Sequence, residues 1–166
     1  MTEEEILSTD ETSPLFLNTV CFTGHRTLGE DFSRTRLSDM VGVALRYGYR
    51  TFLCGMAMGF DSVAFDVVFE WKKKYPDVKL VACIPCENQE KYFPEKEKEA
   101  YRERLKKADL SVYVNKEYSS YCMNKRNRYM VDRSSVVFCY IKEKDSGTGN
   151  TVEYARRKKR EIVIIS

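Results

Sequence analysis

The chain has 166 residues, of which 43% are hydrophobic, 13% aromatic and 32% charged. This length suits one well-packed domain, and the aromatic content excludes a disordered chain. Residues 136–141 form the longest apolar run, far short of the roughly 20 residues that span a bilayer. No signal peptide is visible at the start of the sequence, so we expect a cytoplasmic protein with no membrane partner.

The net charge of +3 hides an uneven distribution along the chain. Residues 1–13 carry five acids and no base, which leaves 28 bases against 20 acids in the rest of the sequence. Residues 1–17 are polar, lack a clear period and are interrupted by Pro14. This pattern predicts a mobile acidic arm over residues 1–17, followed by one folded domain over residues 18–166.

After the arm, short β-prone runs alternate with segments of helical period. The expected strands are 19–23, 50–54, 78–84, 110–114, 135–141 and 161–165. The expected helices are 33–47, 60–75, 95–107, 124–133 and 150–159. Apolar strands that alternate with helices are typical of parallel βαβ units, so we expect an α/β fold, a single doubly wound domain with a mainly parallel sheet of about six strands. Ligands of such folds bind outside the carboxyl ends of the strands.

Six cysteines raise the question of disulfides or a metal site. Four of them lie inside apolar runs that read as buried strands: Cys21, Cys54, Cys83 and Cys139. Cys83 and Cys86 have C-x-x-C spacing, but no second pair stands at zinc-site spacing and the motif closes a strand rather than opening a helix. We therefore expect reduced, buried structural thiols and no metal.

The loop after the first strand contains Gly24, His25 and Arg26. Glycine allows close approach of the backbone to a ligand, and arginine offers a planar fork for phosphate. His25 is the only histidine in the chain. The alternative is a plain strand-to-helix turn with an exposed arginine.

The loop after the second strand is built from small residues at Gly55, Ala57 and Gly59, with Met56 between them. Such a turn presents N–H groups at the start of the next helix, as anion sites do. Asp61 follows, and it either caps that helix or points into the cleft, where it could accept hydrogen bonds from a ribose and act as a base. The spacing leaves both interpretations open.

A second candidate phosphate cradle lies before the last helix, at Gly147, Thr148, Gly149, Asn150 and Thr151. Its alternative is a flexible polar loop. Two glycine-rich turns at strand ends of one small sheet support phosphate binding more strongly together than either turn does alone.

The segment 118–132 is rich in Tyr, Asn and Arg, which could stack a base or line a nucleic-acid groove. The alternative is an amphipathic helix with Tyr129 and Met130 in the core. We expect a mixed case, in which Arg126 and Asn127 face the ligand cleft from the start of a helix.

These motifs, taken in order, resemble those of the YpsA-like branch of the SLOG superfamily, which is named for the DNA-processing protein DprA and the LOG nucleotide hydrolases. The resemblance covers about residues 19–165. The matching segments are Gly24-His25-Arg26, residues 55–61, Ile84-Pro85 with Gln89, Tyr101 with Ala108-Asp109, Arg126-Asn127 with residues 129–132, and Gly147-Thr148 through Asn150-Thr151 with Ala155.

The resemblance implies a Rossmann-like fold and a ligand such as ADP-ribose, an NAD-type molecule or a nucleoside monophosphate, held by these motifs, Pro85 included. Some SLOG branches are phosphoribohydrolases that cut the N-glycosidic bond. Others sense or sequester nucleotide signals in bacterial stress or phage defence, and DprA-like members bind single-stranded DNA. In LOG enzymes a glutamate takes part in catalysis, and the alignment places Tyr154 at its position, with Glu153 one residue away.

We therefore expect a sensor or sequestering module for a phosphorylated nucleotide-derived ligand, without cofactor or metal. The alternative is a phosphoribohydrolase in which Asp61 acts as the catalytic carboxylate. A second alternative is DprA-like binding of single-stranded nucleic acid, and the sequence feature that supports it is the run of five cations at residues 156–160. We interpret that run as a solvated helix end, so nucleic acid is not the expected partner. A homo-oligomer is left open.

Overall fold

The computed structural model describes residues 1–165 and contains one six-stranded sheet in the order β4-β3-β2-β1-β5-β6. All five strand pairs are parallel, which confirms the expected doubly wound α/β fold. The strands are β1 (Thr19–Gly24), β2 (Thr51–Cys54), β3 (Lys79–Ile84), β4 (Leu110–Tyr113), β5 (Val136–Tyr140) and β6 (Glu161–Ile164). They fall within a few residues of the expected ranges.

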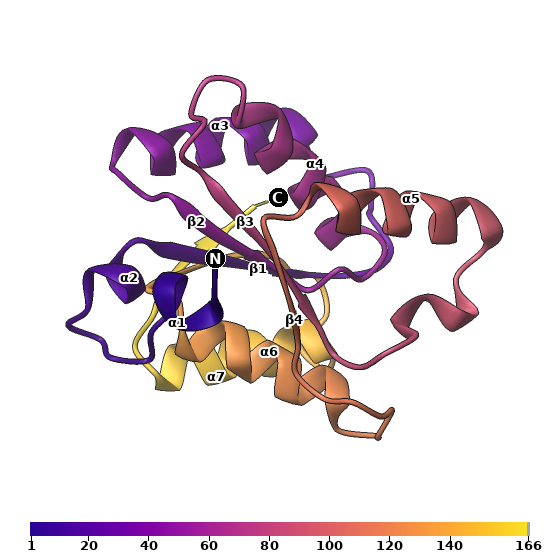
Figure 1. The fold of residues 1–166 in the computed structure, drawn as a ribbon. Coiled ribbons are helices and arrows are strands. Elements are labelled where there is room, and N and C mark those ends of the chain that lie inside the picture. The colour runs from indigo at the N-terminus through magenta and orange to yellow at the C-terminus, as the bar shows by residue number, and fades with distance from the viewer. Residues whose placement is uncertain (166) are drawn as a thin grey trace.

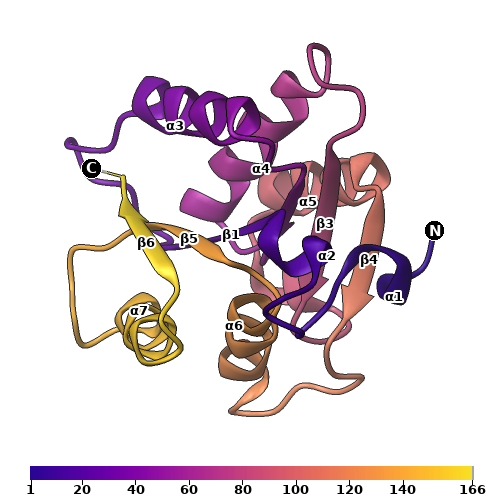
Figure 2. The same cartoon turned by 90° about the vertical axis from the view of Figure 1, so that its left-hand side faces the viewer.

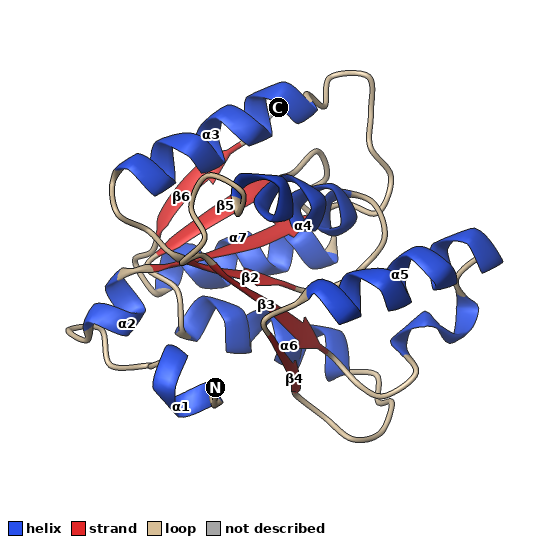
Figure 3. Ribbon diagram, turned by 45° about the horizontal axis from the view of Figure 1, so that its top comes forward, coloured by secondary structure: helices blue, strands red, loops and turns tan. Residues whose placement is uncertain are grey.

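The helices that join the strands cover both faces of the sheet (Figure 1). They are α3 (Arg34–Arg46), α4 (Phe60–Trp71), η1 (Gln89–Tyr92), α5 (Glu95–Lys107), α6 (Cys122–Asp132) and α7 (Gly147–Arg157). The strand order runs outward from β1 to β4 and then returns to β5 beside β1. Because parallel crossovers are right-handed, this reversal places α3, α4 and α5 on one face and α6 and α7 on the other (Figures 1 and 3).

The reversal also fixes where a ligand site can form. β1 has β2 on one side and β5 on the other, so the loops that leave β1 and β5 diverge to opposite faces. A crevice opens between such loops at the carboxyl ends of the strands. One core cluster fills the α3–α4 face and includes Phe22, Phe52 and Phe60, while a second cluster lies on the α6–α7 face.

Residues 1–17 differ from the expected mobile arm, because they form two short helices that pack on the domain (Figure 2). These are α1 (Glu3–Ile6) and α2 (Pro14–Leu17). Ile6 and Leu7 are buried in the second core cluster. Two acids are also engaged, since Glu3 accepts a hydrogen bond from the Tyr129 hydroxyl and Glu11 lies 2.9 Å from the Arg160 guanidinium. The segment therefore covers part of the α6–α7 face.

Replacing Ile6 by alanine is expected to lower the free energy of unfolding by about 2 kcal/mol, because the side chain is buried against the sheet. Urea denaturation measures this loss. Glu4→Gln is the matched control, since Glu4 is exposed in the same helix. Equal stability of both variants would mean that α1 does not pack as described.

The cysteines and the lengths of the helices can also be compared with the sequence predictions. All six cysteines are free and buried, including the four that were expected in buried strands. None of the helices in residues 1–165 is long and apolar enough to cross a membrane.

Candidate functional site

A cavity of about 630 Å³ opens at the carboxyl ends of β1 and β5. Such a volume is in the range of small-molecule sites. The cavity is lined by the loops after β1 and β5 and by the first turns of α4, α6 and α7. Nine of the residues expected at the site line it: Gly24, His25, Arg26, Ala57, Asp61, Arg126, Asn127, Gly147 and Thr148.

Arg126 is a buried cation in this wall, with 5% of its surface exposed. Its guanidinium donates to the Gly55 carbonyl and to Asn127 Oδ1, the latter at 2.8 Å. Within residues 1–165, no carboxylate oxygen forms an ion pair with it at 4.0 Å or less. A buried charge is normally paired, so this guanidinium is suited to an anionic ligand.

Asp61 is the buried acid of the cavity. Its Oδ2 accepts a hydrogen bond from the Ala57 N–H at 3.1 Å, so the carboxylate holds the turn before α4 and also faces the cavity. Burial raises the pKa of Asp61 to about 6, although the Arg126 guanidinium and the Ala57 N–H act in the opposite direction. Asp61 therefore does not cap α4, whose N-cap is Gly59 without a side-chain cap hydrogen bond, and its position agrees with the interpretation as a cleft carboxylate.

Gly55, Met56 and Gly59 do not line the cavity but shape it from behind. A Cβ atom on Gly55 would lie 2.8 Å from Arg126 Nη1 and 3.0 Å from Asp61 Oδ2, so glycine lets both charged groups approach the turn. Gly59 has φ +81°, and a Cβ there would lie 2.1 Å from the Arg26 carbonyl oxygen. This turn supports Arg126 and Asp61 from behind, and its role as a phosphate cradle stays a prediction.

The first turn of α7 presents backbone N–H groups at the cavity. The helix begins at Gly147 instead of the expected Asn150, because the Ser146 hydroxyl accepts from the Gly149 N–H at 3.0 Å and caps it. The Asn150 N–H is bonded to the Ser146 carbonyl. The N–H groups of Gly147 and Thr148 have no intrahelical partner, and both residues line the cavity.

Gly149, Asn150 and Thr151 lie outside the cavity lining, as does Pro85. Thr151 donates its hydroxyl hydrogen bond back to the Gly147 carbonyl. The Pro85 carbonyl accepts from Asn115 Nδ2 at 3.0 Å. These residues shape the segments around the site.

Gly149→Ala is expected to destabilise the protein by about 1–2 kcal/mol, since the new Cβ would lie 1.9 Å from the Lys144 carbonyl oxygen. Gly147→Ala is the matched control on the same helix turn. No atom lies within 4 Å of the Cβ position at Gly147, so this change should leave the unfolding free energy within about 0.5 kcal/mol. Thermal or urea unfolding compares the two, and similar losses would contradict the described path of residues 144–149.

The His25 side chain connects the loop after β1 to the loop after β5. Its Nε2 accepts from the backbone N–H groups of Lys142 at 2.7 Å and Glu143 at 3.2 Å, so this nitrogen is already engaged in hydrogen bonds. Nearby, the Tyr140 hydroxyl donates to Asp31 at 2.9 Å, and Asp31 pairs with Lys142. His25 thus positions a loop, and the structure gives it no free nitrogen at Nε2 for proton transfer.

The cavity lining also includes residues that the sequence analysis did not predict as site residues, among them Tyr140, Asp31, Lys142 and Met123. Asp31 and Lys142 lie in polar loops that carry no motif. Tyr140 ends a buried strand and gave only an apolar signal, although a hydroxyl at a strand's carboxyl end could have marked it.

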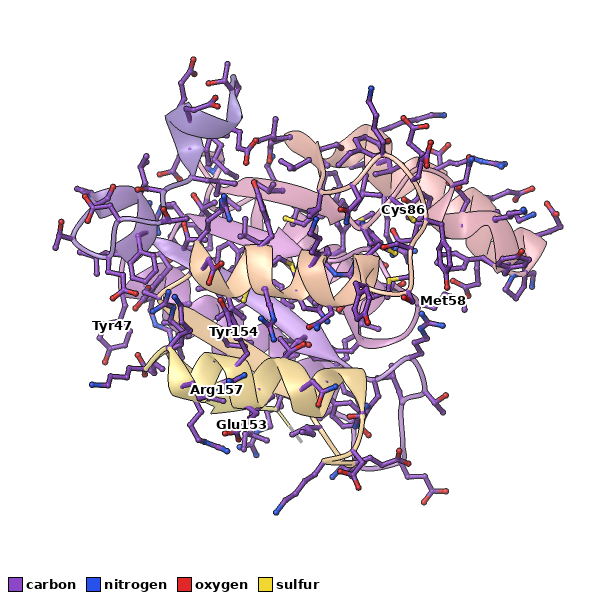
Figure 4. All side chains as sticks on the ribbon, turned by 90° about the horizontal axis from the view of Figure 1, so that it is seen from below. Tyr47, Met58, Cys86, Glu153, Tyr154 and Arg157 are labelled. Atoms are coloured by element: carbon purple, nitrogen blue, oxygen red, sulfur yellow. The ribbon has the colours of Figure 1, made fainter. Side chains whose placement is uncertain are left out.

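The position that LOG enzymes give to a catalytic glutamate lies away from the cavity. Figure 4 shows Tyr154 between α6 and α7, where its hydroxyl donates to Asp132 Oδ1 at 2.6 Å. Glu153 points to the outer side of α7 and pairs with Arg156 at 3.4 Å. Neither side chain lines the cavity, which leaves Asp61 as its buried carboxylate.

A family model described as the YspA SLOG family matches residues 32–164. The chain belongs to this SLOG family. The match begins after the Gly24-His25-Arg26 motif and includes Asp61, Arg126 and the first turn of α7. The buried charged groups of the cavity, Asp61 and Arg126, and the start of α7 therefore lie in the matched part, whereas Arg26 and Asp31 precede it.

Relatives of this SLOG chain occur in bacilli. The SPbeta prophage-derived protein YoqJ of Bacillus subtilis (strain 168) is 31% identical over 118 residues, which cover 64% of this chain and 69% of YoqJ. A UPF0398 protein of Bacillus thuringiensis (strain Al Hakam) is 30% identical over 107 residues, which cover 63% of this chain and 58% of that protein.

Two solved structures share the fold. DprA of Streptococcus pneumoniae superimposes with a TM-score of 0.66 at 18% identity, over 89% of this chain and 50% of that one. DprA of Helicobacter pylori, described for its single-stranded DNA binding mode, gives 0.64 at 16% identity, over 90% of this chain and 65% of that one. The SLOG chain thus spans half to two thirds of these DprA chains, and the likeness at this identity concerns the fold.

Proposed function

We propose that the cavity binds a phosphorylated, ribose-containing ligand of the nucleoside monophosphate, ADP-ribose or NAD type, and that the protein acts as a sensor or sequestering module for it. The observation that carries this proposal is Arg126, a buried guanidinium in the wall of the cavity. In the described part of the chain it has no carboxylate oxygen within 4.0 Å and interacts with Asp61 only at longer range. The free N–H groups at the start of α7 add a second anion-binding element to the same wall.

The positions of the charges suggest how such a ligand lies. A phosphate is favoured at Arg126 and the first turn of α7, and Arg26 supplies a further cation from the exposed rim. Asp61 disfavours an anion at the start of α4 and is suited to accept hydrogen bonds from ribose hydroxyls.

Thermal unfolding in the presence of AMP, ADP-ribose, NAD and adenosine tests this function. A ligand at 100 times its Kd adds roughly 2.7 kcal/mol, which for a chain of this size raises the midpoint by roughly 5–10 °C. We expect a shift with at least one phosphorylated compound and none with adenosine. The absence of any shift at millimolar concentrations would overturn the proposal.

Turnover of the ligand is a second candidate function, favoured by the raised pKa of Asp61. A carboxyl group with a pKa of about 6 is matched to general acid–base work near neutral pH. Release of free base from AMP or NAD, lost in Asp61→Asn, would support a phosphoribohydrolase. Release that survives the substitution would exclude Asp61 from the chemistry.

Single-stranded DNA is a third candidate ligand, because DprA of Helicobacter pylori, which shares the fold of this chain, binds it. The cation run at 156–160 does not favour DNA here, because Arg160 is buried beside Glu11 and Arg156 pairs with Glu153. Binding of a labelled oligonucleotide that falls steeply with salt would favour DNA, since counterion release dominates such binding.

A further inference from the structure

Two cysteines that are distant in the sequence lie against each other. Cys86 follows the end of β3 and Cys122 is the first residue of α6, 36 positions later. Their Sγ atoms are 3.9 Å apart. Cys83, the other half of the C-x-x-C motif, instead packs inside the second core cluster with Leu53 and Val81. The motif is therefore split, and its outer cysteine has a different partner.

We propose that Cys86 and Cys122 are a site of oxidative modification, at which a hydroperoxide converts the two thiols into an intramolecular disulfide. The Cys86 thiolate attacks one peroxide oxygen, which forms a sulfenic acid and releases water or an alcohol. The Cys122 thiolate then attacks the Cys86 sulfur and expels hydroxide, which takes up a proton and leaves as water. Overall two S–H bonds and one O–O bond break, one S–S bond and two O–H bonds form, and the hydroperoxide accepts the two electrons.

The geometry requires only a local adjustment. The sulfur atoms must approach from 3.9 Å to the about 2.05 Å of a disulfide. Residues 116–121, which lead into Cys122, are all exposed, and their backbone hydrogen bonds include those of the Lys116 carbonyl with the Glu87 N–H and of the Ser119 carbonyl with the Cys122 N–H. Access of a hydroperoxide requires a local opening, since Cys86 has 2% of its surface exposed and Cys122 has none.

The surroundings of Cys86 set the pH dependence of the reaction. Desolvation and the contact with Cys122 raise the pKa of Cys86, and the Arg126 guanidinium acts in the opposite direction. Only the thiolate is nucleophilic. The rate of disulfide formation should therefore rise between pH 7 and pH 9.

The bond would have a structural consequence at the cavity. Met123, Arg126 and Asn127 lie on the first turns of α6 and line the cavity. A disulfide would tie this helix to the end of β3 and close a loop of 36 residues. We expect the oxidised protein to unfold at a temperature roughly 5–10 °C above that of the reduced protein.

Mass spectrometry of the full chain tests the proposal. The protein is treated with hydrogen peroxide at pH 8, unfolded, alkylated with N-ethylmaleimide and digested with trypsin without reduction. The expected product is one cross-linked peptide pair joining Cys86 to Cys122, which dithiothreitol separates. Because Cys83 and Cys86 share a tryptic peptide, fragment ions must locate the maleimide on Cys83.

Serine variants provide the matched controls. Cys83→Ser should keep the cross-link, whereas Cys86→Ser and Cys122→Ser should abolish it. A Cys83–Cys86 bridge in the wild-type chain would overturn the proposal. So would alkylation of all six cysteines after peroxide treatment, or conversion of Cys86 to a sulfinic acid without a cross-link. The wild-type result decides the matter even where a variant fails to fold.

Discussion

Arg126→Gln is expected to weaken binding of a phosphorylated ligand about 100-fold, which corresponds to roughly 2.7 kcal/mol. Arg126 is the buried guanidinium of the cavity, and within residues 1–165 no carboxylate oxygen lies within 4.0 Å of it, although Asp61 interacts with its charge at longer range. A ligand phosphate would supply a close anionic partner, so removal of the charge removes an interaction made in a desolvated site.

Isothermal titration with whichever compound shifts the thermal midpoint measures the effect. Arg128→Gln is the matched control, because Arg128 lies two residues further along α6, is exposed and does not line the cavity. We expect the control to bind within a factor of two or so of the wild-type chain. Equal losses in both variants would show that overall charge, rather than this guanidinium, holds the ligand.

Asp61→Asn is expected to raise the free energy of unfolding at pH 8 by up to roughly 3 kcal/mol. The folded-state pKa of Asp61, about 6, lies above its ordinary value of 3.8 because burial disfavours the charged form. The contribution of this carboxyl group to stability is therefore complete below about pH 4 and is lost as the pH rises through 6. Asparagine avoids that loss and keeps an oxygen for the Ala57 N–H.

Urea denaturation at pH 4.5 and pH 8 gives the required comparison. The gain from Asp61→Asn should be small at the lower pH and largest at the higher one. The exposed Asp145, changed to asparagine, is the control and should alter stability by less than about 0.5 kcal/mol. A variant less stable than the wild-type chain at pH 8 would contradict the description of Asp61 as a destabilising buried acid.

The same substitution links stability to function. If Asp61 accepts hydrogen bonds from ribose, Asp61→Asn should stabilise the free protein and bind its ligand more weakly. Such opposition is expected where a buried charge is retained for binding.

The fold could be predicted from the sequence because its signals are local. Each β-branched run ends at a glycine, proline or polar turn, and the helices between them carry a clear period. The N-terminal segment was not predictable in this way. Ile6 and Leu7 are adjacent and Phe16 stands apart from them, so the three residues show no helical or alternating period. Ile6 and Leu7 are buried because they pack on the α6–α7 face of the sheet.

The site was predictable to the level of loops but not of contacts. Strand ends and glycines indicated residues 24–26, 55–61 and 147–151, and the cavity lies among these segments. The role of each segment depends on tertiary contacts that the sequence does not show. Gly59 packs against the Arg26 backbone and Gly55 against the Arg126 side chain, so residues 55–59 support the side of the cavity. The Ser146 hydroxyl caps the Gly149 N–H, so α7 begins at Gly147.

A crystal structure of the protein with AMP tests the central claim most directly, because it locates the phosphate. We predict phosphate oxygens within hydrogen-bond distance of the Arg126 guanidinium and of the Gly147 and Thr148 N–H groups. A phosphate bound instead at the turn of residues 55–59 would contradict the claim. If AMP raises the thermal midpoint in solution, an empty cavity in crystals grown at saturating AMP would contradict it as well.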